Sequence, residues 1–305
     1  MGKIAFIFSG QGAQHPGMGR ELWECSDRAK EVFALCDSIR PGTTEQCFHG
    51  SAEELKDTAN TQPCMFAVQM AAAEILREKG IVPQALAGFS LGEIAAMTYA
   101  GCAPLEEGFR LVTKRGERMA AAAKKTDAQM AAVLRLGEDE VKKLTEAFPN
   151  VYPVNYNCPD QIVVSGLKEE MPAFSAAVKA AGGRTLPLKV GGGFHSPFMK
   201  EAAEGFYEDL KACVLKAPEI PLYSNVTGSL YNGDIKELLS RQISSPVQWE
   251  AIVRNMLAGG IDTFLELGPG RTLCGLIEKI DRSVRTFSLS SKEDLMTILQ
   301  EVTPC

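Results

Sequence analysis

The sequence predicts an α/β protein in which helices cover both faces of a parallel sheet and a smaller ferredoxin-like unit is inserted. In the first 125 residues, and again near the C-terminus, short apolar runs with strand character alternate with helical stretches, as in parallel sheets. From 126 to 190 the predicted order is βαββαβ, which is that of a ferredoxin-like unit. We therefore expect a core domain formed by 1–125 and 191–305, and a small domain formed by 126–190.

The first strand and the strand before a serine-containing turn are predicted from apolar runs. Ile4–Phe8 is a short, uninterrupted apolar run, typical of a buried strand. Gln84–Gly88 is a second short strand, which ends two residues before Ser90. Residues with helical periodicity predict helices over Arg20–Leu35, Pro63–Lys79, Glu93–Tyr99 and Pro104–Ala123.

The inserted unit and the C-terminal part follow from the same patterns. The predicted elements of the insertion, in order, are a strand over Met130–Leu136, a helix over Glu138–Ala147, strands over Val151–Asn155 and Gln161–Ser165, a helix over Glu169–Ala181 and a strand over Arg184–Val190. Afterwards Thr263–Leu267 predicts a core strand, and a helix is expected from Thr272. The return of strand and helix signals indicates that the small unit interrupts the core.

The composition excludes several functional classes. With 32 basic and 38 acidic residues the formal net charge is −6, whereas binding to nucleic acid generally needs a basic surface. The nine cysteines have no CxxC spacing and the three histidines lie far apart, so we expect neither a disulfide framework nor a metal site. Free thiols favour a cytoplasmic location. No apolar segment is long enough to predict a membrane span.

The segment Gly88–Gly92 (GFSLG) fits a nucleophile elbow, which is a sharp turn between a strand and a helix. Ser90 at its centre is the predicted nucleophile. The two glycines leave room for strained backbone, and the helix N-terminus offers unpaired N–H groups to an oxyanion. Because the pattern alone is weak, a structural glycine-rich turn is the alternative interpretation.

His195 is the predicted base that a serine nucleophile needs. It lies in Gly191–Pro197 (GGGFHSP), where the chain returns to the core and a cleft is expected. His15 lies in a glycine-rich loop and His49 in a polar stretch. No acidic residue stands out as a third member, but a backbone carbonyl can orient an imidazole as well. The site is then a Ser-His dyad; the alternative is an incidental histidine in a flexible loop.

Arg115 falls within the apolar stripe of its predicted helix. Gly108, Leu111, Val112 and Met119 share that face at helical spacing. Burial of an unpaired guanidinium is costly, so a partner is expected. The partner could be a core carboxylate in a structural salt bridge. A functional interpretation is equally open: a clamp for a substrate carboxylate, which would select a dicarboxylic acyl group such as malonyl.

These motifs belong to an ordered set of six: Ser9–Gln14 (SGQGAQ), Gly88–Glu93 (GFSLGE), Arg115, Phe194–Met199 (FHSPFM), Ser245–Trp249 (SPVQW) and Glu266–Gly270 (ELGPG). In this order, and over nearly the whole chain, the sequence resembles the malonyl-CoA:acyl-carrier-protein transacylases of bacterial fatty acid synthesis. The resemblance implies a hydrolase-like α/β core with a ferredoxin-like insertion, in agreement with the pattern of elements.

The resemblance also implies roles for individual residues. Ser90 would take the malonyl group from CoA as an ester, and His195 would activate first Ser90 and then the thiol of the carrier's phosphopantetheine arm. Arg115 would bind the malonyl carboxylate. The backbone N–H groups of Gln11 and Leu91 would form the oxyanion hole.

Two further residues and the partners are implied in the same way. The backbone carbonyl of Gln248 would orient the His195 ring, and Asn157 would face the active site from the small domain. Malonyl-CoA and acyl carrier protein would be the partners, with no cofactor beyond the CoA thioester. Lys189 and Lys200 flank the His195 loop and are candidate contacts for the carrier.

The chain departs from the family pattern at two places. Phe89 stands where the family usually has histidine, and Gly192 and Gly193 stand where malonyl-selective polyketide loaders often have His-Ala. We expect the chemistry to survive and malonyl to remain the preferred acyl group. Three other functions are alternatives: a trans-acting loader of a polyketide carrier, an α/β-hydrolase esterase, and an inactive carrier-binding scaffold. The lack of an HGGG motif disfavours the esterase, and the presence of both Ser90 and His195 disfavours the scaffold.

Overall fold

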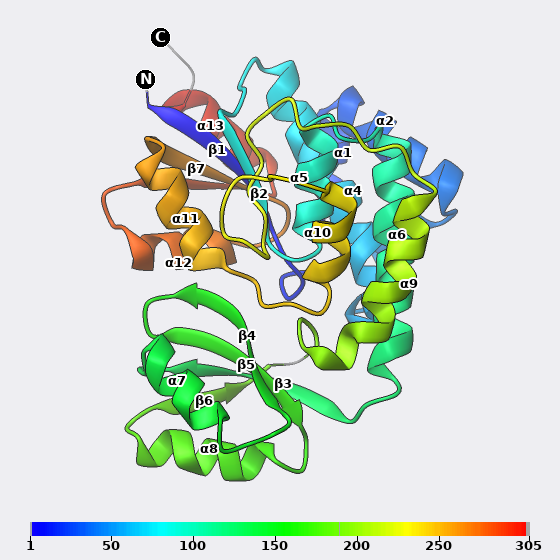
Figure 1. The fold of residues 1–305 in the computed structure, drawn as a ribbon. Coiled ribbons are helices and arrows are strands. Elements are labelled where there is room, and N and C mark those ends of the chain that lie inside the picture. Colours follow the sequence, from blue (N-terminus) through cyan, green and yellow to red (C-terminus); the bar gives the residue numbers. More distant parts are fainter. Residues whose placement is uncertain (1, 189, 303–305) are drawn as a thin grey trace.

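The computed structural model describes residues 2–188 and 190–302, and Lys189 lies outside them. The described chain contains two four-stranded sheets. We call the sheet nearer the termini the core sheet and the other the small sheet; Figure 1 shows them as separate layers. The strands of the core sheet run parallel in the order β2-β1-β7-β8. Their bounds are β1 Lys3–Phe8, β2 Ala85–Gly88, β7 Ile261–Leu267 and β8 Arg285–Leu289.

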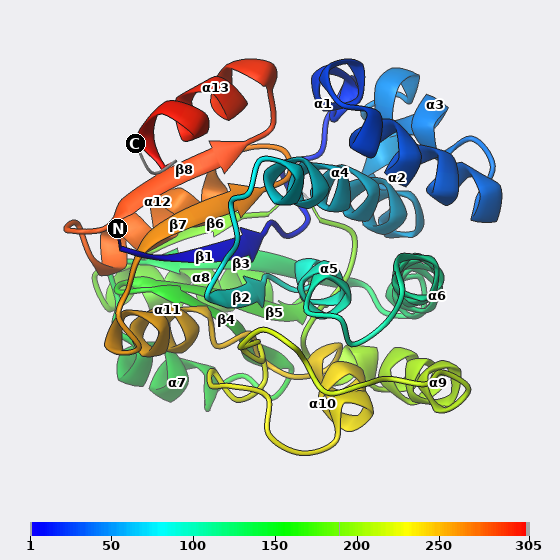
Figure 2. The same ribbon diagram turned by 90° about the horizontal axis from the view of Figure 1, so that it is seen from above.

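The helices of the core lie on both faces of its sheet, as Figure 2 shows for α4 and α11. Alternate residues of β1 point to opposite faces, and both faces are apolar. Phe6 and Phe8 belong to the cluster that includes α4, whereas Ala5 and Ile7 belong to the cluster that includes α11 and α12. This two-sided burial explains the uninterrupted apolar run at the start of the sequence.

The core helices are α1 Arg20–Cys25, α2 Asp27–Ile39, α3 Thr43–His49, α4 Thr58–Glu78, α5 Gly92–Tyr99, α6 Leu105–Ala123, α9 Lys200–Lys211, α10 Ile235–Gln242, α11 Trp249–Ala258, α12 Thr272–Ile280 and α13 Lys292–Glu301, with 3₁₀ turns at Glu54–Lys56 and Pro197–Met199. The single helix predicted over Arg20–Leu35 is wrong. Ser26 adopts an extended conformation there, and its side chain accepts the N–H of Ala29 and begins a new helix.

The small sheet is antiparallel, in the order β4-β5-β3-β6. Its unit consists, in chain order, of β3 Ala128–Leu134, α7 Glu138–Thr145, β4 Val151–Cys158, β5 Gln161–Leu167, α8 Met171–Ala180 and β6 Arg184–Pro187. This is the predicted βαββαβ order, so the predicted fold class is confirmed. The domain boundaries at 126 and 190 remain a prediction.

The small sheet contacts the core through β4, whose edge pairs with the segment before α11. The N–H of Tyr156 donates to the carbonyl of Val247 at 2.9 Å, and the N–H of Val247 donates to the carbonyl of Val154 at 2.9 Å. Asn155 and Val247 form a parallel bridge there. This pairing positions the small sheet over the carboxyl end of β2, where Ser90 follows.

Candidate active site

Ser90 occupies a strained turn between β2 and α5. Its φ is 54°, in the left-handed region that non-glycine residues rarely adopt. A Cβ on Gly88 would collide with the backbone of Gly92, and a Cβ on Gly92 would collide with the carbonyl of Phe8. The turn therefore needs both glycines, and it has the predicted strand–turn–helix geometry; the role of Ser90 as nucleophile stays a prediction.

The imidazole of His195 faces Ser90 with the correct nitrogen for a base. Its Nε2 lies 2.7 Å from Ser90 Oγ, and its Nδ1 lies 2.8 Å from the backbone carbonyl of Gln242. Because a carbonyl only accepts, Nδ1 carries the proton and Nε2 is free to take one from Ser90. Burial, together with the Arg115 charge, lowers the pKa of His195 to about 4. The ring is therefore neutral at pH 7.

The prediction that Gln248 orients the His195 ring is wrong, because Gln242 does so. Gln242 is the last residue of α10, where helix carbonyls lack intrahelical partners. Gln248 instead precedes α11, and its carbonyl accepts the N–H of Ile252 at 3.0 Å as the first bond of that helix. The carbonyl of Gln248 is therefore already engaged.

Arg115 is fully buried on α6 and points toward Ser90. Its Nη1 donates to Gln62 Oε1 at 2.7 Å; its Nη2 donates to Gln242 Oε1 at 2.6 Å and to Ser90 Oγ at 3.2 Å. Among the described residues no carboxylate forms an ion pair with it, so of the two interpretations the structural salt bridge is not found. Its Nε has no hydrogen-bond partner among those same residues. Burial lowers the pKa of Arg115 to about 10, so it stays cationic at pH 7.

Gln11 and Leu91 both line the cavity that contains Ser90, His195 and Arg115. Neither backbone N–H donates to another group within the described chain. Leu91 directly precedes α5, where N–H groups are free for a ligand. Both residues can therefore present an N–H beside the nucleophile, as an oxyanion hole requires.

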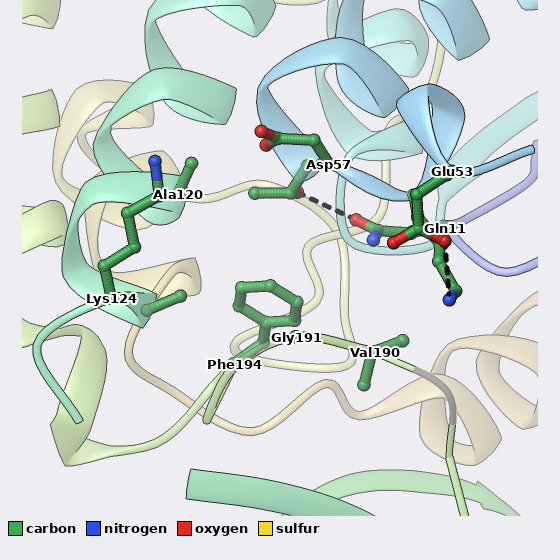
Figure 3. A pocket seen from close by; sticks show the side chains of 11 residues that line it. Gln11, Glu53, Asp57, Ala120, Lys124, Val190, Gly191 and Phe194 are labelled. Atoms are coloured by element: carbon green, nitrogen blue, oxygen red, sulfur yellow. Dashed lines mark hydrogen bonds and ion pairs between the residues drawn. The ribbon is translucent and has the colours of Figure 1, made fainter. Parts of the chain in front are cut away.

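The cavity at Ser90 is small, about 80 Å³, and adjoins two larger chambers. One, of about 640 Å³, shares Gln11, Val190 and Phe194 with it. Figure 3 shows this chamber with Lys124 on one side, Gln11 on the other and Phe194 at its base. The other chamber, of about 210 Å³, is lined by Asn155 and Asn157 as well as apolar side chains.

Asn157 lines the chamber of about 210 Å³ but not the Ser90 cavity, while Asn155 lines both. Each of the two side chains is buried, and each Oδ1 lacks a hydrogen-bond partner in the described structure. The predicted Asn157 is therefore next to the active cavity rather than in it. Two free amide oxygens at this position could accept N–H groups of a ligand.

Phe89, the departure from the family pattern, lies against Trp249 with ring centroids 5.5 Å apart. Its ring also lines the Ser90 cavity. The residue therefore contributes an apolar wall beside the nucleophile and takes no part in proton transfer.

Four polar residues that the sequence did not identify complete the site: Gln62, Glu93, Asn225 and Gln242. All four are buried. Gln62 and Gln242 accept hydrogen bonds from Arg115, Asn225 accepts one from the N–H of Ser90, and the Glu93 side chain is linked to this set through Gln242. Gln62 carried a weak signal, since it is one of four polar residues, with Thr58, Thr61 and Gln69, among the mostly apolar buried residues of α4. Asn225 and Gln242 lie in segments whose proximity to Ser90 depends on the fold alone.

Among the described residues, no group of three or more His, Cys, Asp or Glu side chains could hold a metal ion. None of the helices described is long and apolar enough to cross a membrane.

Comparison with known proteins identifies the family. The acyl transferase domain model matches residues 5–294. The malonyl CoA-acyl carrier protein transacylase of Bacillus subtilis is 40% identical, over 98% of this chain and 97% of that protein. The transacylase structure from Clostridium perfringens has a TM-score of 0.95 at 33% identity, covering 98% of this chain and 97% of that one. A malonyl-transacylase solved with its type II PKS acyl-carrier protein has a TM-score of 0.94 at 32% identity, covering 98% and 99%. The chain belongs to the acyl transferase family and, within it, to the malonyl CoA-acyl carrier protein transacylases.

Proposed function

We propose that this chain transfers a malonyl group from malonyl-CoA to the phosphopantetheine thiol of an acyl carrier protein. One observation carries the proposal: a Ser-His dyad shares its cavity with a buried arginine that has no carboxylate partner in the part of the chain that the structure describes. The dyad supplies acyl transfer. Because the partners of the guanidinium are neutral, it selects an acyl group that brings its own carboxylate, and malonyl is such a group.

The first half of the reaction acylates the enzyme. His195 Nε2 takes the Ser90 proton while Ser90 Oγ attacks the thioester carbon, and the carbonyl oxygen becomes an oxyanion. The N–H groups of Gln11 and Leu91 stabilise that oxyanion, an effect of about 3 kcal/mol per donor in other enzymes. Collapse of the intermediate breaks the carbon–sulfur bond, and the CoA thiolate takes the proton from His195. The product is a malonyl ester on Ser90.

The second half regenerates the enzyme. His195 takes the proton of the carrier's thiol, and the thiolate attacks the malonyl ester. When the carbon–oxygen bond breaks, Ser90 regains its proton from His195. The atoms and charges balance without any redox or metal step, so we infer a reaction that needs no cofactor.

The two halves use thioesters with the same pantetheine arm, whose amides need acceptors in a buried channel. Asn155 and Asn157 offer buried, unpartnered oxygens beside the Ser90 cavity, so we infer that they accept amide N–H groups of the arm.

The unpaired cysteines of the described chain are compatible with a reducing cytoplasm, where we place the reaction.

The carrier itself is proposed to be that of fatty acid synthesis, as for the family. A polyketide carrier is the second candidate, because a structural relative was solved with a type II PKS acyl-carrier protein. A panel of purified carriers distinguishes the two: the preferred carrier gives the higher kcat/KM for malonyl transfer.

Intact-mass measurement after incubation with malonyl-CoA tests the chemistry. We expect one malonyl adduct on the wild type and none on Ser90→Ala, because the ester forms on Ser90 Oγ. A Phe89→Ala control, which changes a wall of the cavity, should still acquire the adduct. An adduct on Ser90→Ala would contradict the mechanism.

A further inference from the structure

Glu93, the last residue of GFSLGE, is fully buried in the first turn of α5. Three groups donate hydrogen bonds to its carboxyl oxygens. The Asn225 backbone N–H donates to Oε1 at 2.9 Å, the Tyr231 hydroxyl to Oε1 at 2.7 Å, and Gln242 Nε2 to Oε2 at 2.6 Å. The mechanism above uses none of these contacts, although a buried carboxyl is costly to maintain.

Two of these donors also hold the catalytic groups. The Asn225 side chain accepts the N–H of Ser90 at 2.8 Å and donates to the carbonyl of Gly88 at 2.6 Å, which brackets the strained turn. Gln242 Nε2 donates to the Ser90 carbonyl at 2.6 Å, while its Oε1 accepts Arg115 and its backbone carbonyl accepts His195 Nδ1. The Glu93 side chain is therefore linked to Ser90, His195 and Arg115 by hydrogen bonds that pass through one intermediate residue, either Asn225 or Gln242.

The protonation state of Glu93 determines whether this network can form. A backbone N–H can only donate, and the Gln242 amide must present its NH₂ to Glu93 because its oxygen accepts Arg115. Only an ionised carboxylate accepts all of these donors. A protonated Glu93 would need an acceptor. The Tyr231 hydroxyl could supply one only by giving up its own bond to Oε1, and rotation of the Gln242 amide to supply one would turn NH₂ toward the Arg115 guanidinium.

We propose that Glu93 is a positioning residue of the transfer reaction, which in its ionised form holds Asn225 and Gln242 and so keeps Ser90, His195 and Arg115 aligned. This inference rests on the proposed malonyl transfer. Glu93 touches no reacting atom, and it does not line the Ser90 cavity.

The titration of the surrounding groups makes the proposal testable by pH. Burial raises the pKa of Glu93 to about 7, against the opposing hydrogen bonds and the Arg115 charge. The other ionisable groups around it titrate elsewhere. Burial lowers the pKa of His195 to about 4 and of Arg115 to about 10, and burial raises the pKa of Tyr231 and that of Cys102, to about 11 for the latter.

The sign of the expected pH effect follows. The ionised form predominates above the pKa of Glu93, so kcat/KM falls as the pH drops through about 7. Neutral His195 persists down to about pH 4. In the wild type, the protonation of Glu93 therefore sets the pH at which kcat/KM declines on the acidic side. Protonation of His195 lowers kcat/KM further only near pH 4.

The experiment measures kcat/KM for malonyl transfer from about pH 5 to about pH 9 in the wild type and three variants. Glu93→Gln places an NH₂ group against the NH₂ of Gln242, so kcat/KM at about pH 7.5 should fall about 10- to 100-fold. The decline of kcat/KM near pH 7 should disappear in this variant, because it has no carboxyl at this position. Tyr231→Phe removes the hydroxyl that donates to Glu93 and lowers the pKa of its carboxyl, so the decline of kcat/KM in this variant should move to higher pH. Tyr223→Phe is the matched control, because its hydroxyl contacts the Asn255 carbonyl instead, and its decline should not move.

The outcomes separate this inference from the proposed function. No malonyl transfer by the wild type contradicts the proposed function itself. If the wild type transfers malonyl, an unchanged decline near pH 7 in Glu93→Gln overturns the inference, even where activity is lower, because a merely structural role would leave the decline in place. If Glu93→Gln does not fold, the test rests on Tyr231→Phe. If kcat/KM of that variant declines at the same pH as in the wild type, the inference is overturned.

Discussion

Arg115 is a buried cation whose immediate partners are neutral. Amide oxygens of Gln62 and Gln242 orient its guanidinium at 2.7 and 2.6 Å but do not neutralise it. The charge of Glu93 acts on Arg115 across Gln242, without direct contact, and raises its pKa against the effect of burial. A substrate carboxylate at this position would gain a charge-assisted, desolvated contact. The residue is therefore suited to distinguish malonyl from acetyl.

Replacing Arg115 by alanine should remove this distinction. We expect kcat/KM with malonyl-CoA to fall about 100-fold, since a buried charge pair is lost, while acetyl-CoA becomes a comparatively better substrate. Arg115→Lys is the control, because it keeps the charge but not the planar set of donors. Competition between the two thioesters measures the ratio, and undiminished malonyl preference in Arg115→Ala would rule out the clamp.

The elbow between β2 and α5 is determined by close approach of three backbone segments. Gly92 lies so near β1 that a Cβ would meet the Phe8 carbonyl, and Gly88 lies against Gly92. Backbone atoms cannot yield as a flexible side chain can. The same contact that permits the strained φ of Ser90 thus makes the element intolerant of any larger residue.

Gly92→Ala should therefore destabilise the protein by about 3 kcal/mol or more in the free energy of unfolding. Gly275→Ala is the matched control: it also lies in a helix, α12, but its Cβ would meet no atom within 4 Å. That variant should be neutral or more stable by up to about 1 kcal/mol. Urea unfolding of both variants measures the difference, and equal stabilities would contradict the packing argument.

At the scale of the molecule, the active cavity is made by both sheets. Ser90 and Arg115 come from the core, while Met130 and Asn155 come from the small sheet and Phe194 from the connection back to the core. The volume at the nucleophile is small, about 80 Å³. A malonyl group on Ser90 would fill much of this space and leave little room for an attacking water.

The malonyl-enzyme should therefore persist when no thiol is present. After removal of malonyl-CoA, we expect the adduct mass to decay far more slowly than it disappears on addition of a carrier thiol. Intact-mass measurements over time give both rates. Rapid release of free malonate without an acceptor would indicate an esterase instead.

Local patterns in the sequence were sufficient for the α/β class, the βαββαβ insertion and the residues Ser90, His195 and Arg115. Each is encoded within a short segment: a strand–turn–helix with two glycines, a glycine-rich loop, and a charged position in an apolar helical stripe. Such signals depend on neighbours in the chain, so they are readable without the fold.

Only the tertiary structure decided how these residues are held. Gln242 orients His195 rather than Gln248, because the carbonyl of Gln248 is used by α11 while that of Gln242 ends α10. Amides rather than a carboxylate surround Arg115, and Glu93 lies behind them. These contacts join segments up to 152 residues apart. A hydrogen bond over such a distance leaves no periodicity in the sequence, since its partners are chosen by the packing of whole elements.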